Sequence, residues 1–421
     1  MDFAPVKGTR DFYPEELAQR NWLFGKFRET ALKFGFEEFD TCILEHEELY
    51  IRKAGDEITG QLYNFEDKGG RRLALRPELT PSLARMIMAK EKNLQYPVKW
   101  FSIPQCFRYE KMQKGRRREH FQWNMDIIGQ AEITAEAELL SAIVTLCTSL
   151  GLSAQDLKIR MSNRKILQEV FVSIGLPENR FAEVCVIIDK RDKIGDENVT
   201  RLLTEAGIES KVTDGILQLL QARKQEEIVQ LNGSLPAGLA EMNRFFTIAE
   251  LYGIRDYIEF DISVIRGLSY YTGIVFEVFD TRGQSRAICG GGRYDNLMQT
   301  LGGKSLPMVG FGFGDVVISD ILTERGLFPP YKKTDCALVF PFSEAEQEQA
   351  IKLAASLRRK GEQVELDLTF RKLKKLLSQA DKTGYRRLYI LAPDELKDNK
   401  ILVKNLADRT ETRVAAGDLI D

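Results

Sequence analysis

The segment 121–127 reads Phe-Gln-Trp-Asn-Met-Asp-Ile, in which apolar and polar residues alternate without a break. A period of two residues is that of a β-strand, because successive side chains point to opposite faces of a sheet. The core face would carry Phe121, Trp123, Met125 and Ile127, and the opposite face Gln122, Asn124 and Asp126. Three hydrogen-bonding side chains on one strand face predict a polar small-molecule pocket beside the sheet.

A basic loop lies directly before this strand: residues 108–118 read Arg-Tyr-Glu-Lys-Met-Gln-Lys-Gly-Arg-Arg-Arg. A guanidinium group binds phosphate or carboxylate through two parallel hydrogen bonds and stays charged at physiological pH. Arg108 and Glu110 are two residues apart, so on a strand they project to the same face. This cation and acceptor suit the α-phosphate and the amino group at opposite ends of one nucleotide. The other interpretation, a solvated hairpin loop, stays open from these residues alone.

The length of 421 residues leaves room for two or three domains with a substantial core. The chain is 43% hydrophobic and 29% charged, as ordinary soluble globular proteins are. Its net charge of -2 argues against a protein that coats nucleic acid through bulk charge. Local basic patches, which are what matter for binding one structured RNA, remain open.

The six cysteines are widely scattered and form no C-x-x-C pair, and only His46 and His120 accompany them. A zinc site is therefore not expected, nor any other metal held by the protein itself. Residues 1–5 lack the basic and apolar pattern of a signal peptide, and no window holds about 18 uninterrupted apolar residues. We expect reduced thiols in a cytoplasmic protein that does not enter a membrane.

The periodicity along residues 1–325 predicts helices and short strands. Helical spacing begins at Pro14 and ends at Gly35, begins again at Thr80-Pro81, and runs from Thr134 to Gly151. Strands are expected at Val98–Ile103, Phe121–Ile127, Ile258–Val264, Gly273–Phe279 and Ser285–Cys289. Hairpin-type loops such as 280–283 join consecutive strands, which indicates a largely antiparallel sheet. Residues from about 165 to 245 are charged and mainly helical, and we interpret them as an insertion.

A linker at 326–333, Gly-Leu-Phe-Pro-Pro-Tyr-Lys-Lys, separates this part from residues 334–421. Beyond the linker the predicted order is strand, helix, strand, helix, strand. The first of these helices follows the capping box Ser343-Glu344-Ala345-Glu346. This order predicts a small α/β domain with a partly parallel sheet.

Two glycine-rich stretches do not match nucleotide-binding loops. In Gly302-Gly303-Lys304-Ser305, the first glycine of a P-loop would fall at Met298. Residues 310–314, Gly-Phe-Gly-Phe-Gly, do not fit G-x-G-x-x-G either. They indicate close backbone packing in a strand or close approach to a ligand, and both remain open.

Two further stretches gain meaning only in combination. Residues 266–273, Arg-Gly-Leu-Ser-Tyr-Tyr-Thr-Gly, follow a predicted strand whose polar face carries Glu259, Asp261 and Ser263. The tyrosine pair could belong to the core or contact a ligand. The flanking glycines favour a backbone that is shaped to fit a ligand. Residues 75–81, Leu-Arg-Pro-Glu-Leu-Thr-Pro, could be a capped helix start alone.

Together these stretches resemble the class II aminoacyl-tRNA synthetases, and within that class the histidyl-tRNA synthetase family. The resemblance rests on Lys7–Asp11, Leu75–Thr80, Phe107–Glu110, Arg266–Tyr271, Gly290–Asp295 and the tail. Arg-Gly-Leu-x-Tyr-Tyr combined with Gly-Gly-Arg-Tyr-Asp is highly specific to this family and its paralogues. The resemblance implies an α+β class: a catalytic domain over 1–325, built on the class II antiparallel sheet with a helical insertion, and an α/β anticodon-binding domain over 334–421.

The implied activity is the ATP-dependent conversion of L-histidine to histidyl-adenylate, followed by transfer to tRNA(His). Magnesium would enter with ATP, held mostly by phosphate oxygens and water. The implied catalytic residues, Arg108 and Arg266, would meet the reacting carboxylate and α-phosphate. The histidine site would comprise Glu78, Leu79, Thr80, Arg108, Gln122, Asp126, Arg266, Tyr270 and Tyr271. The ATP site would comprise Arg108, Glu110, Arg116, His120 and Arg293.

The sequence departs from the family pattern at four places. Cys42 replaces the motif 1 proline, Ser269 replaces an aspartate, and His120 replaces a phenylalanine that stacks on adenine. Gly314-Asp315-Val316-Val317 replaces Gly-Leu-Glu-Arg, so the motif 3 arginine that contacts ATP is missing. This variant resembles the organellar and cyanobacterial branch of the family. Another arginine, Arg293 or Arg117, would have to neutralise the terminal phosphates.

The resemblance also implies partners. The tRNA contacts would be Gln113, Lys114 and Arg117 in the basic loop, and Arg371, Lys372 and Lys374 in the tail. A basic helix start is also common as a solvated face, and this alternative stays open. A homodimer is implied by the family only. The rival hypotheses are a non-catalytic paralogue, such as the regulatory subunit of ATP phosphoribosyltransferase, and an RNA-binding adaptor without chemistry.

Overall fold

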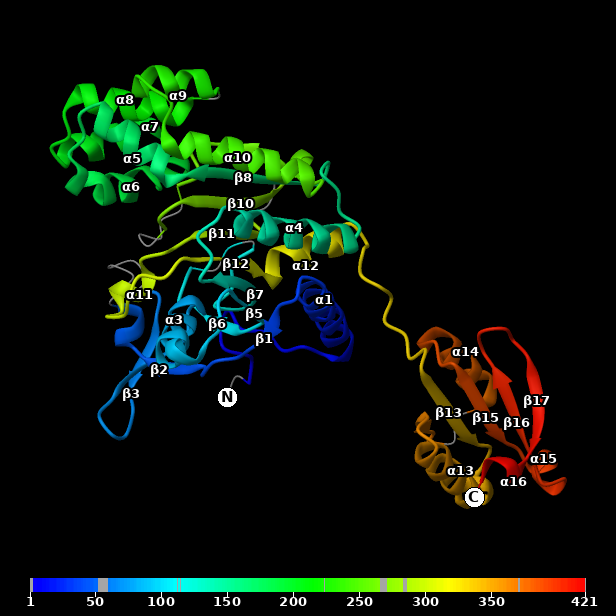
Figure 1. Cartoon of the computed structure of the whole chain (residues 1–421). Coiled ribbons are helices and arrows are strands. Elements are labelled where there is room, and N and C mark those ends of the chain that lie inside the picture. Colours follow the sequence, from blue (N-terminus) through cyan, green and yellow to red (C-terminus); the bar gives the residue numbers. More distant parts are fainter. Residues whose placement is uncertain are drawn as a thin grey trace. The chain divides into compact units, whose positions relative to one another are not determined.

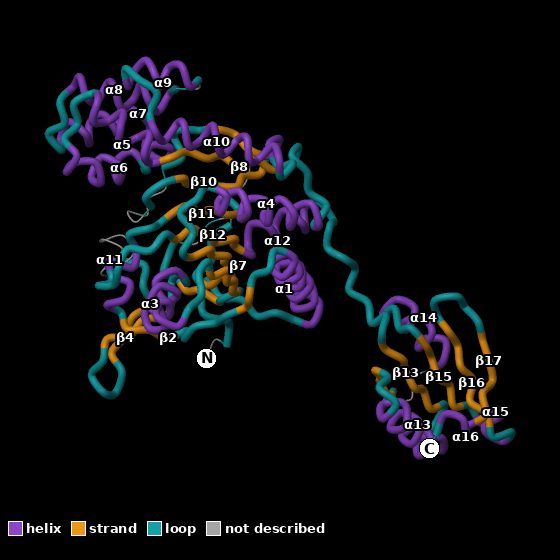
Figure 2. Tube along the Cα trace, viewed as in Figure 1, coloured by secondary structure: helices purple, strands orange, loops and turns teal. Residues whose placement is uncertain are grey.

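The computed structural model describes residues 3–51, 60–111, 113, 115–222, 224–265, 271–282, 286–369 and 372–420, with the backbone alone at 192 and 193. The chain divides into two compact units, Met1–Phe328 and Pro329–Asp421 (Figure 1). Each unit combines helices with a sheet (Figure 2). The α+β class predicted from the sequence is confirmed.

A nine-stranded sheet organises the first unit, in the order β1-β5-β7-β12-β11-β10-β8-β9, with β6 paired to β7. Its strands are β1 (Glu37–Glu38), β5 (Val98–Ser102), β6 (Gln105–Phe107), β7 (Glu119–Ile128), β8 (Leu157–Asn163), β9 (Ile258–Phe260), β10 (Ile274–Asp280), β11 (Cys289–Arg293) and β12 (Met308–Gly314). The pairs β1/β5 and β8/β9 are parallel, and the other pairs in this order are antiparallel. The largely antiparallel sheet predicted from the hairpin loops is therefore confirmed.

The apolar face of β7 belongs to the main core. Helices α1 (Pro14–Lys33), α4 (Thr134–Ser149) and α12 (Asp315–Glu324) lie along this side of the sheet (Figure 1). Trp123 is fully buried, and its ring stacks on Phe27 of α1 with 5.2 Å between centroids. Met125 and Ile127 join the same core cluster, which confirms the alternation predicted for this strand. The helix ends predicted at Gly35 and Gly151 are also confirmed, because both glycines have a positive φ that favours glycine.

The glycines of β12 make room for the polar face of β7. The antiparallel register places Gly310 opposite Asp126 and Gly312 opposite Asn124. A Cβ atom at Gly310 would overlap the Asp126 carboxylate, and one at Gly312 would overlap the Gln122 amide. The side chains of β7 therefore lean over β12, and these glycines serve close packing within the sheet.

A three-stranded sheet and two short helices complete the core of this unit. The sheet, in the order β2-β4-β3, contains β2 (Leu44–His46), β3 (Tyr63–Glu66) and β4 (Arg72–Leu75). The helices are α3 (Thr80–Lys90), which continues into the 3-10 helix η1 (Glu91–Asn93), and α11 (Leu297–Thr300). The helix start predicted at Thr80-Pro81 is confirmed.

A group of helices lies between β8 and β9 in the chain (green in Figure 1). It comprises α5 (Arg164–Ser173), η2 (Glu178–Arg180), α6 (Phe181–Ile188), α7 (Arg191–Glu205), α8 (Ser210–Gln221), α9 (Gln225–Asn232), α10 (Ala237–Leu251) and η3 (Arg255–Tyr257). Asn163 caps the first of them, since its side chain accepts a hydrogen bond from the backbone N–H of Lys165 at 3.0 Å.

Two predicted strands are wrong in their extent. The segment Ile258–Val264 is a strand only to Phe260, because Oδ1 of Asp261 accepts hydrogen bonds from the backbone and hydroxyl of Ser263 and turns the chain. The predicted common face of Glu259, Asp261 and Ser263 is therefore absent from these described residues. In place of a strand over Ser285–Cys289, β11 begins at Cys289.

The second unit contains a five-stranded sheet in the order β14-β13-β15-β16-β17. Its elements are β13 (Cys336–Pro341), η4 (Glu344–Glu346), α13 (Gln347–Arg359), β14 (Gln363–Leu366), α14 (Leu373–Thr383), β15 (Arg387–Leu391), α15 (Pro393–Lys397), β16 (Lys400–Asn405), β17 (Glu411–Ala415) and α16 (Ala416–Leu419). Strands β14, β13 and β15 are parallel, which confirms the partly parallel sheet, and the capping box at Ser343 and Glu346 is formed. The antiparallel pair β16/β17 was not predicted.

Candidate active site

A cavity of about 720 Å³ lies against the polar face of the large sheet. Gln122, Asn124 and Asp126 of β7 line it together, as the alternation predicted. Asn124 is only 3% exposed, and its Oδ1 accepts no hydrogen bond within the described parts of the chain. A buried acceptor of this kind suits a ligand donor.

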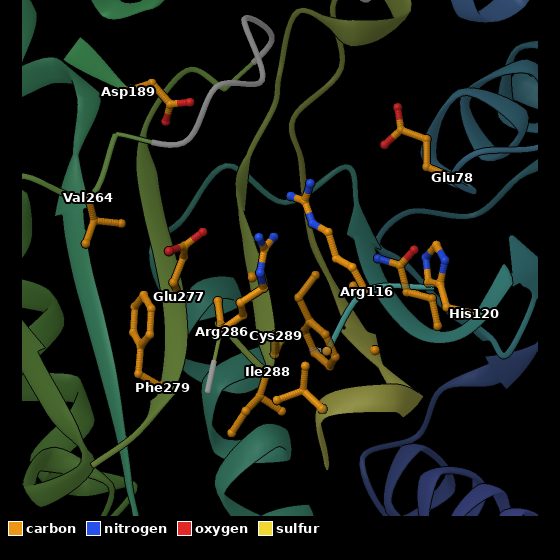
Figure 3. Close-up of a pocket in the computed structure, with 18 of the residues that line it drawn as sticks. Glu78, Arg116, His120, Asp189, Val264, Glu277, Phe279, Arg286, Ile288 and Cys289 are labelled. Atoms are coloured by element: carbon orange, nitrogen blue, oxygen red, sulfur yellow. The ribbon is translucent and has the colours of Figure 1, made fainter. Parts of the chain in front are cut away.

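Most of the residues that the sequence predicted for a site line this one cavity. They are Glu78, Thr80, Arg108, Glu110, Arg116, Arg117, His120, Gln122, Asp126 and Tyr271. Figure 3 shows Glu78 and His120 on one wall of the cavity, and Glu277 and Arg286 on another. Segments that are separated by up to about two hundred residues in the sequence thus meet here.

One end of the cavity is formed by an acidic side chain and two tyrosines. Asp126 is 2% exposed, and its Oδ1 accepts a hydrogen bond from the hydroxyl of Tyr294. The rings of Tyr271 and Tyr294 meet edge to face with 6.5 Å between centroids. A buried carboxylate beside tyrosine rings can bind a flat, hydrogen-bonding heterocycle such as imidazole.

The basic loop supplies the cations of the cavity. Nε of Arg108 donates to the backbone carbonyl of Pro77 at 2.9 Å, which anchors this side chain to the segment before α3. Nη1 of Arg116 lies 2.8 Å from Oε2 of Glu110, whose side chain is 9% exposed. Arg108, Arg116 and Arg117 thus line the cavity alongside the single carboxylate of this loop, which gives this end a positive potential suited to phosphate.

The imidazole of His120 is uncharged at neutral pH. Burial, together with the nearby charges of Arg108 and Arg10, lowers the pKa of His120 to about 3. A hydrogen bond with the Gln122 side chain opposes this shift. A neutral ring that lines the cavity can stack on a heterocycle without adding to the charge of the arginines.

We expect His120 to make the protein sensitive to acid. The folded imidazole gains its proton near pH 3 and the unfolded one near pH 6.5, so between these values only the unfolded chain is protonated. The contribution of His120 to the free energy of unfolding is therefore fully present above about pH 6.5. It falls with decreasing pH, by at most roughly 1.4 kcal/mol per pH unit. His120→Gln should flatten this decline between pH 6.5 and 4, as measured by urea unfolding at a series of pH values.

His46 offers the matched control. It is exposed on β2, so the substitution there removes no buried ring. His46→Gln should leave the slope of stability against pH unchanged. A His120→Gln slope equal to that of the unmodified chain would contradict the buried neutral state of His120.

Arg293 has a different place from the one predicted. It does not line the cavity; its Nε and Nη2 bind the two carboxylate oxygens of Glu136 at 2.6 and 2.8 Å. Nη1 donates to the backbone carbonyl of Gln130 at 2.9 Å and to Asp295 at 3.3 Å. Because these partners occupy the guanidinium of a residue that is 6% exposed, Arg293 serves the fold, and its assignment to ATP is corrected.

Several other predicted residues lie outside the cavity or outside the described residues. Leu79 is fully buried at the N-terminus of α3, and the side chain of Gln113 binds Arg286. Lys372 and Lys374 are exposed at the start of α14 in the second unit. Arg266, Tyr270, Lys114 and Arg371 lie outside the described residues.

The cavity contains residues that the sequence did not single out for a site. Asn124 was predicted only as part of a polar strand face, and Arg286 was not predicted for a site. Asn124 could have been found from its position between Gln122 and Asp126 on the alternating strand. Arg286 carried no such signal, since a lone arginine before a strand is usually solvated.

No three histidine, cysteine, aspartate or glutamate side chains in the described ranges are grouped so as to hold a metal ion. Of the helices described, none has the length and apolar character needed to span a bilayer. All six cysteines are free thiols.

Comparisons with known proteins agree along the whole chain. The family model described as histidyl-tRNA synthetase matches residues 8–314, and an anticodon binding domain model matches residues 336–421. The chloroplastic/mitochondrial histidine–tRNA ligase of Arabidopsis thaliana is 46% identical over 419 residues, covering 100% of this chain and 86% of the relative. The histidine–tRNA ligase of Opitutus terrae is 40% identical, covering 98% of this chain and 96% of the relative.

Solved structures share the fold. The histidyl-tRNA synthetase of Nostoc sp. PCC 7120 superposes with a TM-score of 0.79 at 24% identity, covering 100% of this chain and 99% of that one. An ATP phosphoribosyltransferase regulatory subunit/histidyl-tRNA synthetase from Bacillus halodurans superposes with a TM-score of 0.74 at 23% identity, covering 93% and 98%. These two likenesses concern the fold alone, whereas the family model covers well over half of the chain at the sequence level. The chain belongs to the histidyl-tRNA synthetase family of class II aminoacyl-tRNA synthetases.

Proposed function

We propose that this chain is a histidine–tRNA ligase, which activates L-histidine with ATP and transfers the histidyl group to tRNA(His). The observation that carries the proposal is the single cavity where Arg108 lies with the polar face of β7 and the start of α3. Such a cavity provides cations for a phosphate and hydrogen-bonding groups for an amino acid, which the first step requires together.

In the first step, a carboxylate oxygen of histidine attacks the α-phosphorus of ATP, and the bond to the departing pyrophosphate breaks. We assign Arg108 to the histidine carboxylate and the α-phosphate, where negative charge accumulates. Arg266, which lies outside the described residues, is proposed for the same charge. Magnesium would enter with the ATP substrate and would neutralise part of the phosphate charge.

We assign Glu78, Thr80 and Gln122 to the α-ammonium group of histidine, with Asp126, Tyr270 and Tyr271 at the imidazole. Glu110 is proposed to accept from the adenine amino group, while His120 stacks on adenine and Arg116 reaches the distal phosphates. The assignment of Glu110 to the adenine amino group draws support from the 9% exposure of its side chain, since a buried carboxylate discriminates well between donors.

In the second step, a terminal ribose hydroxyl of tRNA(His) attacks the acyl carbon and AMP departs. We propose Gln113, Lys114 and Arg117 for the acceptor end, and Arg371, Lys372 and Lys374 for the anticodon end. Support comes from the exposure of Gln113, Arg117, Lys372 and Lys374, because phosphate contacts need accessible side chains.

Asp126→Ala is expected to raise the KM for histidine by roughly 10- to 100-fold, because a hydrogen bond to a charged group is lost. The KM for ATP should change little, since Asp126 accepts a hydrogen bond from Tyr294 and is proposed for the imidazole, not for the nucleotide. Initial rates of pyrophosphate exchange at varied histidine and at varied ATP give both constants. An equal rise in the two would contradict the assignment of Asp126 to the imidazole.

Histidine-dependent exchange of labelled pyrophosphate into ATP tests the function itself. A histidine–tRNA ligase supports this exchange, whereas a regulatory subunit that senses histidine, or an RNA-binding adaptor, does not. The match of an anticodon binding domain model to residues 336–421 favours the ligase, because such a domain serves the binding of tRNA. Exchange that is absent, or independent of histidine, would refute the proposal.

A homodimer is part of the proposal. Apolar side chains are exposed on and beside the small sheet: Ile43 is 47% exposed, Leu44 42% and Phe65 44%. Exposed apolar side chains of this kind suit a surface that a second subunit covers. Sedimentation equilibrium should give twice the chain mass of 48.0 kDa, and a monomer at micromolar concentration would contradict this part.

We propose the cytoplasm as the compartment, on the basis of the free thiols.

A further inference from the structure

Arg286 is an additional cation at the basic end of the cavity. It lies three residues before β11, lines the cavity and is half-buried. Its Nη2 donates a hydrogen bond to Oε1 of Gln113, which is 173 residues away in the sequence. Figure 3 shows the guanidinium groups of Arg116 and Arg286 directed into the same cavity. The segment before β11 and the basic loop are thus joined at this point.

The charges around Arg286 are not balanced. Glu110 pairs with Arg116, and no aspartate or glutamate in the described parts of the chain forms an ion pair with Arg286. Burial lowers the pKa of Arg286, and the charge of Arg116 lowers it further. Two guanidinium groups therefore share one carboxylate, and an anion that bound between them would relieve their repulsion.

Val317 of α12 lies across from Arg286. The ideal Cβ position of Gly115 is 3.2 Å from Cγ2 of Val317 and 4.0 Å from Cδ of Arg286, so the three segments meet. Val317 stands where the family pattern Gly-Leu-Glu-Arg has its arginine, and α12 contains neither lysine nor arginine. The helix cannot offer a cation here, whereas the segment before β11 does.

We infer that Arg286 binds the distal phosphates of ATP, at the place where α12 lacks an arginine. The inference rests on the proposed function, because its ligand is the ATP of that reaction. A phosphate oxygen would replace the neutral amide of Gln113 as acceptor, and charge-assisted hydrogen bonds are roughly twice as strong as neutral ones. When the α-phosphorus–oxygen bond breaks, its electron pair passes to pyrophosphate, whose growing charge Arg286 stabilises.

The test compares ATP with AMP, which lacks the distal phosphates. Arg286→Ala should weaken ATP binding, measured by calorimetry on the full chain, by about 10- to 100-fold, the usual loss for a hydrogen bond to a charged group. Binding of AMP should change less than about twofold, since AMP offers nothing to Arg286. In pyrophosphate exchange, the KM values for ATP and pyrophosphate should rise while that for histidine stays unchanged.

Two further variants make the result specific. Arg282→Ala removes the same charge four residues earlier, where the side chain is exposed and does not line the cavity, and should leave ATP binding intact. Arg286→Lys keeps the charge without the planar fork and should recover part of the ATP affinity. Equal losses for ATP and AMP, no loss for ATP, or no recovery in Arg286→Lys would each overturn the inference. Because nucleotide binding is measured without histidine, this test gives its answer even if the exchange assay refutes the proposed function.

Discussion

Arg108→Ala is expected to lower the kcat of histidine-dependent pyrophosphate exchange by about 10²- to 10³-fold, the usual effect of removing one preorganised donor from a charged transition state. Arg108 lines the cavity, and its Nε is held by the carbonyl of Pro77, so the remaining guanidinium N–H groups keep a fixed direction. Charge accumulates where the histidine carboxylate meets the α-phosphorus, and Arg108 is proposed to lie at that point. The KM values should change much less than kcat.

The fold should survive this substitution. Arg108 is half-buried and its side chain makes one hydrogen bond with the described residues, so the unfolding midpoint should move by a few degrees at most. Arg108→Lys should remain strongly impaired, because an ammonium group cannot reproduce two parallel hydrogen bonds. A kcat within about fivefold of the unmodified chain, at saturating substrates, would remove Arg108 from the proposed catalytic residues.

Arg293→Ala is expected to lower the free energy of unfolding of the first unit by about 3–5 kcal/mol, because it leaves a buried charge without its partner. Glu136 is 1% exposed, and both of its carboxylate oxygens bind the Arg293 guanidinium. All three tryptophans of the chain, Trp22, Trp100 and Trp123, belong to this unit. Urea unfolding followed by tryptophan fluorescence therefore reports on the unit that contains the pair.

A double substitution separates the ion pair from other roles of Arg293. In Arg293→Met/Glu136→Met no charge is left buried, so most of the stability lost in Arg293→Ala should return. Arg325→Ala serves as a comparison. Its partner Asp280 is also buried, but Arg325 binds only one oxygen of that carboxylate. If Arg293→Ala instead raised the KM for ATP and left the unfolding curve unchanged, the original assignment of Arg293 to the nucleotide would be restored.

The sequence was informative wherever neighbouring residues decide the structure. The alternation in 121–127 correctly predicted which side chains face the core and which face the cavity. Helix ends at Gly35 and Gly151 followed from the need for a positive φ, and the capping box at Ser343 from local hydrogen bonds. The strand predicted over Ile258–Val264 failed after Phe260, because a turn formed by the Asp261 side chain has the same alternation as a strand.

Ten of the site residues that the family resemblance implied line one cavity, whereas Arg293 does not. The resemblance indicates positions along the chain, whereas the partner of Arg293 is Glu136, 157 residues earlier on another element. Only the packing of α4 against the sheet brings that carboxylate within reach. The same reason explains why Arg286 was not foreseen, since its neighbours Gln113 and Val317 come from two distant segments.

The sequence by itself determined the class of the fold, the faces of its main strand and the family. The tertiary structure alone decided which arginines remain available to a ligand and which are bound to carboxylates. The physical reason is that periodicity specifies the direction of a side chain on its own element, while the charge it meets depends on strand order and helix packing. Arg293 and Arg286 are both arginines at the two ends of one short stretch, yet one binds a buried glutamate and the other faces the cavity.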